Sequence, residues 1–505
     1  METEIELKFF VSAQFSQYLT SKIEQYKVLQ QGVRELGNTY YDTPTNQLRQ
    51  HDIGLRIRRF DDVHIQTLKT AGRVVAGLHQ RPEYNAELSG NTLDLSLIPA
   101  QAWPEHFDVA ALNAELHPLF STNFSRQQWL VALNDGAQIE IAFDQGQVLA
   151  NEQTDDICEV ELELKSGQAD ALFTLARELC ADGGIRLGNL SKAARGYRLA
   201  SGYQGDPVRS LSLVDITDTD SVEQVFVKSL DHALAHWHYH EQIYFERQSP
   251  NALKQIRVAI QFIMQILSVF GALVPKRGSA VIRQELKWLR GELNWLDEAN
   301  SIEILTEDKG HTLRKLDARK SLVKQLKKRR ERLPEADDML ALFQSARYCS
   351  LLLDLSRWII SRGWQPMLDE KSKDKLVEPV KEFADQCLSY SWQELMDVLP
   401  IDSQLSAEDY IGLYTKLSRN LLTGMCFGKL YDEEVCDSFR LPWYDLLQGI
   451  EDLQQLALIG KLLDKQPDPE DREQISKWLS RKQSSLLSAM QQTRDNSLTL
   501  DAYWP

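Results

Sequence analysis

The 505-residue chain lacks the features that mark secreted, membrane-spanning and zinc-binding proteins. Its six cysteines are widely scattered and form no C-x-x-C pair, which argues against zinc or dithiol redox chemistry. The N-terminal segment is charged rather than signal-peptide-like, and no window approaches 18 uninterrupted apolar residues. We therefore expect reduced thiols, a cytoplasmic location and no membrane partner.

Positive charge is outweighed by negative charge, since 57 Lys and Arg stand against 73 Asp and Glu and the formal net charge is -16. A chain this acidic is not expected to bind nucleic acid in general. The total hides one basic stretch, since residues 254–332 hold 18 Lys and Arg against 9 Asp and Glu. This stretch leaves room for a local anion-binding surface, although we interpret its densest run, residues 324–332, as a solvated helix end.

The first 202 residues alternate apolar and polar side chains with a period of two, which is typical of β-strands. The alternating runs cover residues 2–10, 33–42, 53–60, 63–70, 80–88, 126–133, 138–145 and 157–165. The run Phe60-Asp61-Asp62-Val63 predicts a hairpin turn. Helical patterns fit residues 12–26, 168–182 and 191–202. We predict a β-rich α+β domain over residues 1–202.

The pattern changes after a segment rich in Gly, Pro and Ser, residues 203–217, which we interpret as a linker. From residue 218 to 505 the apolar residues recur with a period of about 3.6. Long helical patterns cover residues 220–248, 251–270 and 335–362, among others. The second domain is therefore predicted to be an all-α helical bundle.

Charged residues alternate along the first strand, where Glu4, Glu6 and Lys8 share one face. A second row, Glu159, Glu161 and Glu163, repeats this pattern near the end of the domain. One such strand is usually the solvated face of a sheet. Charged faces recur on at least five strands, however, and closing the sheet into a barrel would bring them together. Because fixed charges in a dry interior are costly, the barrel should be a wet tunnel that binds ions.

The residue types in this interior indicate the kind of ligand. Carboxylates suit Mg²⁺ or Mn²⁺, and the five glutamates of the two rows are candidate metal ligands. Arg and Lys suit phosphate. The candidate phosphate-binding cations are Lys8, Arg56, Arg58, Lys69, Arg126, Lys192 and Arg195. A ligand with several negative charges and a bridging metal fits best, and triphosphate is the simplest one.

A set of motifs in this order resembles the CYTH superfamily of triphosphate tunnel metalloenzymes over about residues 1–200. The motifs are Glu4-x-Glu6-x-Lys8, Tyr40-Tyr41-Asp42-Thr43, Leu55-Arg56-Ile57-Arg58, Leu68-Lys69, Arg81-x-Glu83, Asp144, Glu161-x-Glu163 and Ser191-Lys192-x-x-Arg195-Gly196-Tyr197. The resemblance implies an eight-stranded antiparallel tunnel barrel with flanking helices. It also implies metal-dependent chemistry on a triphosphate.

The resemblance implies a role for each matching residue. The implied metal ligands are Glu4, Glu6, Glu161 and Glu163, with Glu159 on the same face. The implied substrate-binding residues are Lys8, Arg56, Arg58, Lys69, Arg81, Arg126, Lys192 and Arg195. Lys8, Glu83 and Asp144 are the implied catalytic residues. Asn85 stands where many relatives show a second glutamate, which is a departure from the family pattern.

The helical half resembles a CHAD domain, which implies polyphosphate as a partner. The resemblance rests on Arg257-Val258, on the run from Arg347 to Leu355 and on Trp358. The chain departs from that family at Lys254, Gln261-Phe262, Leu296-Asp297 and Tyr414 to Ser418. Three histidines, His232, His236 and His240, have a spacing that can hold a metal, but we interpret them as partly buried structural residues.

Together these resemblances predict a hydrolase that cleaves inorganic triphosphate to pyrophosphate and phosphate with Mg²⁺ or Mn²⁺, as in bacterial inorganic triphosphatases. Two alternatives remain open at this point. One is an adenylate cyclase of the class IV type, and the other is a non-catalytic polyphosphate-binding protein. Because the charged strands all precede residue 203, a fragment ending near residue 215 is expected to retain hydrolysis.

Overall fold

The computed structural model describes residues 2–307, 313, 316, 318–399, 404–463 and 468–505. Contacts divide the chain into two compact units. The barrel unit comprises Met1–Asp206 and Leu340–Gly363, and the helical unit comprises Pro207–Met339 and Trp364–Pro505. The division at residues 203–217 stays a prediction, because one segment from the later part of the chain belongs to the barrel unit.

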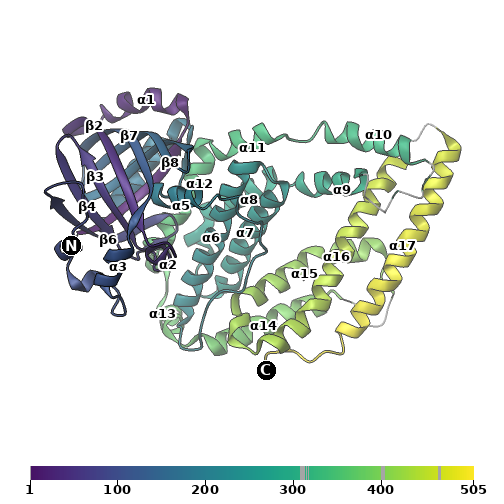
Figure 1. Ribbon diagram of the computed structural model, residues 1–505. Helices are drawn as coiled ribbons and strands as arrows, with labels where there is room; N and C mark the ends of the chain where they lie inside the picture. The colour runs from purple at the N-terminus through teal and green to yellow at the C-terminus, as the bar shows by residue number, and fades with distance from the viewer. Residues whose placement is uncertain (1, 308–312, 314–315, 317, 400–403, 464–467) are drawn as a thin grey trace. The chain divides into compact units, whose positions relative to one another are not determined.

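Eight antiparallel strands close into a barrel in the barrel unit (Figure 1). Their order is β1-β9-β8-β7-β2-β3-β4-β6, and β6 pairs back with β1. Two short strands extend it, since β10 pairs with β1 and β5 with β6. The strands are β1 (Glu2–Val11), β2 (Lys27–Asp42), β3 (Gly54–Phe60), β4 (Val63–Lys69), β5 (Arg73–Val75), β6 (Leu78–Leu88), β7 (His117–Ala132), β8 (Gln138–Ala150), β9 (Gln153–Ser166) and β10 (Ile185–Leu187). The predicted eight-stranded antiparallel barrel is confirmed.

The eight barrel strands correspond to the eight runs that alternate in the sequence. The predicted hairpin turn is also present, because Phe60 pairs with Val63 across it and Asp61 takes a positive φ of 50°. Strands β2 and β7 are longer than their alternating runs and pair with each other from Lys27 to Asp42. Ladder hydrogen bonds satisfy the backbone there even where the alternation of side chains is weak.

Two parts of the barrel's outward face are apolar and are covered by helices. Buried residues of β1, β8 and β9, such as Leu7, Ile141 and Leu162, form one core with α1 (Ala13–Ile23) and α4 (Asp170–Leu179). A second core lies between Leu55 and Leu68 of β3 and β4 and the segment that contains α2 (Gln47–Gln50) and α3 (Val109–Glu115). Since successive side chains of a strand point to opposite faces, these cores direct the charged residues inward.

Helix α5 (Lys192–Ala200) packs against a smaller apolar cluster that includes Tyr40, Phe120 and Phe124. Its Gly196 has no side chain, and an added Cβ would lie 2.0 Å from ring atoms of Phe120. Glycine at this position therefore lets the helix approach the strand closely. This approach brings Lys192, at the start of the helix, to the charged interior.

The helical unit confirms the all-α prediction for the second half. Its helices are α6 (Val222–Arg247), α7 (Pro250–Val269), α8 (Ala280–Glu292), α9 (Leu296–Thr306), α10 (Arg319–Arg330), α13 (Glu370–Val377), α14 (Val380–Met396), α15 (Ala407–Phe427), α16 (Glu433–Leu463) and α17 (Pro469–Ser497). Helix α6 begins with a capping box between Ser221 and Gln224, and α7 begins with a proline, as helix starts commonly do. Helices α9, α10, α16 and α17 enclose one apolar core.

The single helix predicted over residues 335–362 is wrong, because the chain forms two helices there. These are α11 (Ala336–Phe343) and α12 (Ala346–Ile360). Ser345 separates them and acts as the N-cap of α12, since its hydroxyl accepts a hydrogen bond from Tyr348 N at 3.3 Å. A serine side chain that satisfies free N–H groups favours a new helix start over continuation of the old one.

One segment of the helical unit, Pro250–Ala272, is long and apolar enough to cross a membrane, with a mean hydropathy of 1.4. Half of this window is buried inside the protein, as expected for a core helix. A single helix of this kind is weak evidence for a membrane span, because buried core helices meet the same criteria.

Two of the three spaced histidines hold the segment after residue 206 against α6, and the third, His236, contacts α7. The Nε2 atom of His232 lies 2.9 Å from the carbonyl oxygen of Ser212, and His240 Nε2 accepts a hydrogen bond from Arg209 N at 3.3 Å. His236 Nε2 lies 3.1 Å from the side-chain oxygen of Gln255. These contacts agree with a structural role for the histidines.

Candidate active site

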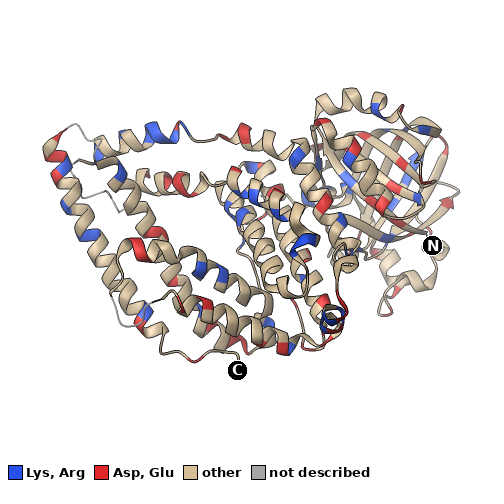
Figure 2. Ribbon diagram, turned by 180° about the vertical axis from the view of Figure 1, so that it is seen from behind, with Lys and Arg blue, Asp and Glu red and all other residues tan. Residues whose placement is uncertain are grey.

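The inward faces of the barrel strands enclose a polar cavity of about 480 Å³, a size typical of small-ligand sites. Both acidic and basic residues occur on the barrel strands, as Figure 2 shows. Seven acidic residues line the cavity, namely Glu4, Glu6, Asp52, Glu83, Glu140, Glu161 and Glu163. Nine basic residues line it, namely Lys8, Arg49, Arg56, Arg58, Lys69, Arg81, Arg126, Lys165 and Lys192. The surplus of positive charge is small, so a polyanion would need a cation of its own.

Strand register brings the predicted metal ligands of the two ends of the domain together. Glu6 of β1 lies opposite Glu163 of β9, and Lys8 lies opposite Glu161. Glu140 of β8 lies opposite Glu163 on the other side and also lines the cavity. Glu140 was not predicted as a site residue, although its alternation with Ile139 and Ile141 and its spacing from Asp144 place it on the inward face.

Glu6 and Glu163 are poorly neutralised by their surroundings. Burial, together with the charge of Glu161, raises the pKa of Glu6 to about 7. Burial also raises the pKa of Glu163, against the opposing effect of Lys165. A divalent cation beside these two carboxylates would offset the cost of keeping them ionised.

Glu161, in contrast, is already surrounded by cations. Lys8 Nζ donates to one of its oxygens at 2.5 Å and Arg126 Nη2 to the other at 2.7 Å. Burial alone would raise the pKa of Glu161, but Lys192, Lys8 and Arg126 together hold it well below its usual value. Glu161 is therefore ionised and connects the acidic and basic parts of the cavity.

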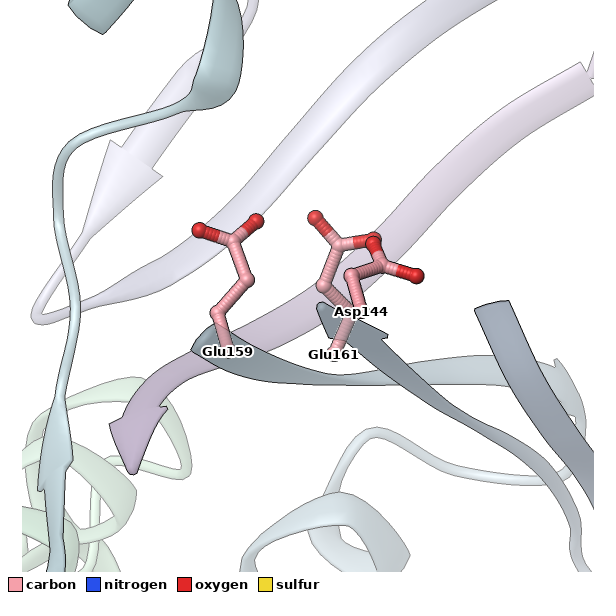
Figure 3. A group of neighbouring side chains, drawn as sticks. All are labelled: Asp144, Glu159 and Glu161. Carbon is pink, nitrogen blue, oxygen red and sulfur yellow. The ribbon is translucent and has the colours of Figure 1, made fainter. Parts of the chain in front are cut away.

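Glu159 and Asp144 lie beside Glu161 but do not line the cavity. Figure 3 shows the three carboxylates side by side on neighbouring strands, and one oxygen of each lies within 4.8 Å of the others. Both Glu159 and Asp144 have no exposed surface. Lys8 and Lys192 donate to Glu159, and Lys192 Nζ lies 2.6 Å from Asp144. These lysines occupy the place that a metal would take in this group, so the ligand role of Glu159 stays a prediction.

Arg58 is poorly neutralised within the cationic wall, whereas Tyr40, Glu83 and Glu4 raise the pKa of the neighbouring Arg56 despite its burial. Arg58 Nε donates to the side-chain oxygen of Asn38 at 2.9 Å, and Arg56 Nη1 donates to Tyr40 Oη at 3.3 Å. Among the described residues, no carboxylate forms an ion pair with Arg58. Burial and the neighbouring Arg56 and Arg126 lower the pKa of Arg58 to about 9. An anion placed here would relieve the repulsion between these guanidinium groups.

The other predicted cations have carboxylate partners. Lys69 contacts Glu4 and lies 3.1 Å from Glu83. Lys69, together with Arg56, outweighs burial and lowers the pKa of Glu83 to about 2. Arg81 Nη2 donates to both carboxylate oxygens of Asp52, at 2.6 and 2.7 Å.

Arg126 and the two predicted cations of α5 lie deeper in the barrel. Arg126 donates two hydrogen bonds of 2.7 Å to Asp144, which orients its guanidinium toward Glu161. Lys192 lines the cavity, whereas Arg195 pairs with Asp155 at 2.7 Å and does not line it. The structure thus brings together all predicted site residues except Glu159, Asp144 and Arg195, which stand behind the lining.

The residues present fit a divalent cation at the carboxylate end of the cavity. Glu4, Glu6, Glu140 and Glu163 supply hard oxygen donors there, and two of them have raised pKa values. A cation held by these residues would supply Lewis-acid stabilisation of charge on phosphate oxygens.

Comparison with known proteins agrees with this geometry. The CYTH domain family model matches residues 2–197, and the CHAD domain family model matches residues 228–464. An inorganic triphosphatase from Haemophilus influenzae is 41% identical over 206 residues, which are 40% of this chain and 56% of that protein. The chain therefore spans about half the length of this curated relative.

Two solved structures are also similar to parts of the chain. The CHAD domain from the plant Ricinus communis is 19% identical, with a TM-score of 0.46 over 59% of this chain and 99% of that one. A Hippeastrum protein described as an adenylyl cyclase with a dominant triphosphatase activity is 19% identical, with a TM-score of 0.30 over 40% of this chain and 96% of that one. From the two family models, the chain contains a CYTH domain at residues 2–197 and a CHAD domain at residues 228–464.

Proposed function

We propose that the barrel hydrolyses inorganic triphosphate to pyrophosphate and phosphate with Mg²⁺ or Mn²⁺. One observation carries the proposal: the same cavity holds poorly neutralised carboxylates, Glu6 and Glu163, and a poorly neutralised guanidinium group, Arg58. A ligand that satisfies both must be a polyanion that carries a divalent cation. The sequence identity with the Haemophilus triphosphatase supports triphosphate as that ligand.

The cationic wall would bind and orient the phosphate chain. Arg56 and Arg58 present planar donors that match two phosphate oxygens at a time, and Lys69 and Lys192 add point charges. Arg126, held by Asp144, is oriented before any substrate arrives. Donors fixed in advance stabilise the charge that develops on the leaving pyrophosphate without further reorganisation.

The predicted catalytic residues differ in their suitability for proton transfer. Glu83 has a pKa of about 2, so it is ionised at neutral pH and is a weak proton acceptor. It can still orient a water molecule by accepting a hydrogen bond. The pKa of Lys8 is raised by Glu159 and Glu161 despite its burial, so Lys8 stays charged and acts as a fixed cation.

A phosphate-release screen tests this proposal. Purified protein is incubated with tripolyphosphate, ATP, thiamine triphosphate and long-chain polyphosphate, each with and without Mg²⁺ or Mn²⁺. We expect metal-dependent release from tripolyphosphate and loss of that release in Glu4→Ala, because Glu4 lines the carboxylate end of the cavity. Near-normal turnover of Glu4→Ala at limiting metal would contradict the ligand assignment.

The same screen separates the two alternatives. Formation of cyclic AMP from ATP, in place of phosphate release, would indicate an adenylate cyclase. Tight binding of polyphosphate without turnover in any divalent metal would indicate a binding protein.

Polyphosphate binding by the helical half stays a prediction. Arg257, at a family-matching position, contacts Asp297, and Lys254, where the chain departs from the family, contacts Asn300. A polyanion would have to compete with the carboxylate of Asp297 for Arg257. The long-chain polyphosphate arm of the screen, measured as binding, tests this partner.

A further inference from the structure

Helix α12 (Ala346–Ile360) lies within the stretch matched by the CHAD family model, but its contacts place it in the barrel unit. It packs against α4, the turn that follows α4 and the short strand β10. The chain on both sides of residues 340–363 belongs to the helical unit. The barrel unit therefore includes a helix whose neighbouring segments in the sequence belong to the helical unit.

The apolar face of α12 is part of the barrel's own core. Cys349 and Leu353 are 0% and 1% exposed and share one cluster with Phe9 of β1, Leu175 of α4 and Ile185 of β10. The Cys180 sulfur, in the turn after α4, lies 3.7 Å from the hydroxyl of Ser350 and also contacts the Cys349 thiol. Such complete burial excludes water from this face of the barrel.

Two glycines, Gly183 and Gly184, pack closely against the start of α12. Gly183 and Gly184 both have a φ of +74°, which favours glycine. Gly184 N donates to Gln344 O at 2.8 Å, while its carbonyl accepts from Ser12 N at 2.8 Å. A Cβ at Gly183 would lie 2.9 Å from Gln344 O. The same backbone segment therefore holds the starts of both α1 and α12.

Ion pairs fix the position of α12 along α4. Arg357 forms a bidentate pair with Asp170, with both hydrogen bonds at 2.6 Å, and Asp354 pairs with Arg177. These side chains are partly exposed, so they contribute little to stability. They fix geometry instead, because two pairs at separate points along the helices specify a single register.

Strand β10, against which α12 packs, is hydrogen-bonded to β1, the strand that carries the candidate metal ligands Glu4 and Glu6. Strand β10 pairs with β1, with Leu187 opposite Phe9 and Ile185 opposite Val11. Gly188 N also donates to the carbonyl of Lys8 at 2.8 Å. Strand β1 carries Glu4 and Glu6, so a shift of β10 would reach the carboxylate end of the cavity.

We propose that α12 is a brace through which the helical half of the chain acts on the barrel: its docking holds β10 against β1 and thereby positions Glu4 and Glu6. This inference rests on the proposed function only in assigning cation binding to β1. It predicts that undocking α12 weakens divalent-cation binding at a distance, without any change to a cavity residue. Residues that hold ligands in place commonly affect metal affinity in this way.

The test compares two glycine variants of the full chain. Gly183→Ala places a methyl group against Gln344, whereas Gly202→Ala has a similar φ of +67° with no atom within 4 Å of its Cβ. Undocking is measured as the rate at which a maleimide labels Cys349, identified by mass spectrometry, and Mn²⁺ affinity is measured by calorimetry. We expect Gly183→Ala to label about tenfold faster and to bind Mn²⁺ about tenfold more weakly, with Gly202→Ala like the wild type.

A second pair of variants acts from the helix itself. Arg357→Asp should weaken docking, and adding Asp170→Arg should restore it by reversing the pair. Faster labelling of Cys349 with unchanged Mn²⁺ affinity would overturn the proposal, as would unchanged labelling in both Gly183→Ala and Arg357→Asp. Both readouts stand without triphosphate, so a failure of the proposed hydrolysis would be recognised separately.

Discussion

The carboxylate of Glu6 offers a quantitative test of the charge balance in the cavity. Its pKa of about 7 in the folded protein compares with 4.5 for an unperturbed glutamate. A difference of this size corresponds to at most about 3 kcal/mol between the two protonation states. Because burial is the largest cause and Glu161 the next, this free energy is the cost of holding an unpaired carboxylate inside the metal-free barrel.

The sign of the effect on stability follows from linkage. Below pH 4.5, Glu6 is protonated in the folded and unfolded states, so its ionisation costs nothing. Between pH 4.5 and about 7 the unfolded chain loses this proton while the folded protein keeps it, so stability falls as the pH rises. Above pH 7 the full cost is present.

Replacing Glu6 by Gln removes that ionisable group. We expect the metal-free Glu6→Gln variant to be more stable than the wild type at pH 8 by up to about 3 kcal/mol, or roughly 6–12 °C in Tm. At pH 4 the two proteins should unfold together. The assay is thermal unfolding in a chelator at both pH values, with Glu87→Gln, an exposed glutamate on β6, as the control.

Added Mn²⁺ should reverse the order at pH 8. The wild type should gain stability from the bound cation, whereas Glu6→Gln has lost one donor and should gain less. The reasoning is refuted if Glu6→Gln is no more stable than the wild type at pH 8, or if its advantage persists at pH 4.

Arg58→Gln should raise the KM for triphosphate about tenfold to hundredfold without loss of stability. Arg126→Gln should lower the free energy of unfolding by about 3–5 kcal/mol, because it leaves buried carboxylates without their donor. Equal unfolding free energies for the two variants would contradict this. Gly196→Ala should destabilise the barrel by about 1–3 kcal/mol through overpacking, measured by urea unfolding, and Gly32→Ala, which has open space around its Cβ, should not. A fragment ending at Asp206 lacks α12, so its Tm should fall well below that of the same fragment joined to residues 340–363. Some hydrolysis should remain in the shorter fragment. Equal Tm values would show that the helix is dispensable.

Much of the fold follows from local patterns. The period of two in the first 202 residues marks the eight barrel strands, because a strand's backbone geometry sets which side chains face inward. The same alternation places Glu4, Glu6, Arg56 and Arg58 on inward faces before any coordinates are known. Glu140 shows the same alternation with its apolar neighbours, although it was not predicted as a site residue.

The balance of charge inside the barrel could not be read from the sequence. Glu159 and Glu163 belong to one alternating row, yet Glu159 is buried against Lys8 and Lys192 while Glu163 lines the cavity with a raised pKa. Neutralisation depends on which strands become neighbours, and β1 pairs with β9 although the two strands lie far apart in the sequence. Residues about 150 positions apart decide this contact.

The amino-acid sequence by itself therefore determined the alternation that makes a charged barrel interior and the period that makes the second half helical. Only the tertiary structure decided which of those charges remain unpaired, and that α12 completes the barrel unit. The physical reason is that backbone periodicity is local, whereas ion pairing and burial depend on surfaces that meet after the chain folds. A helical pattern shows which face of a helix is apolar but not which core that face will join.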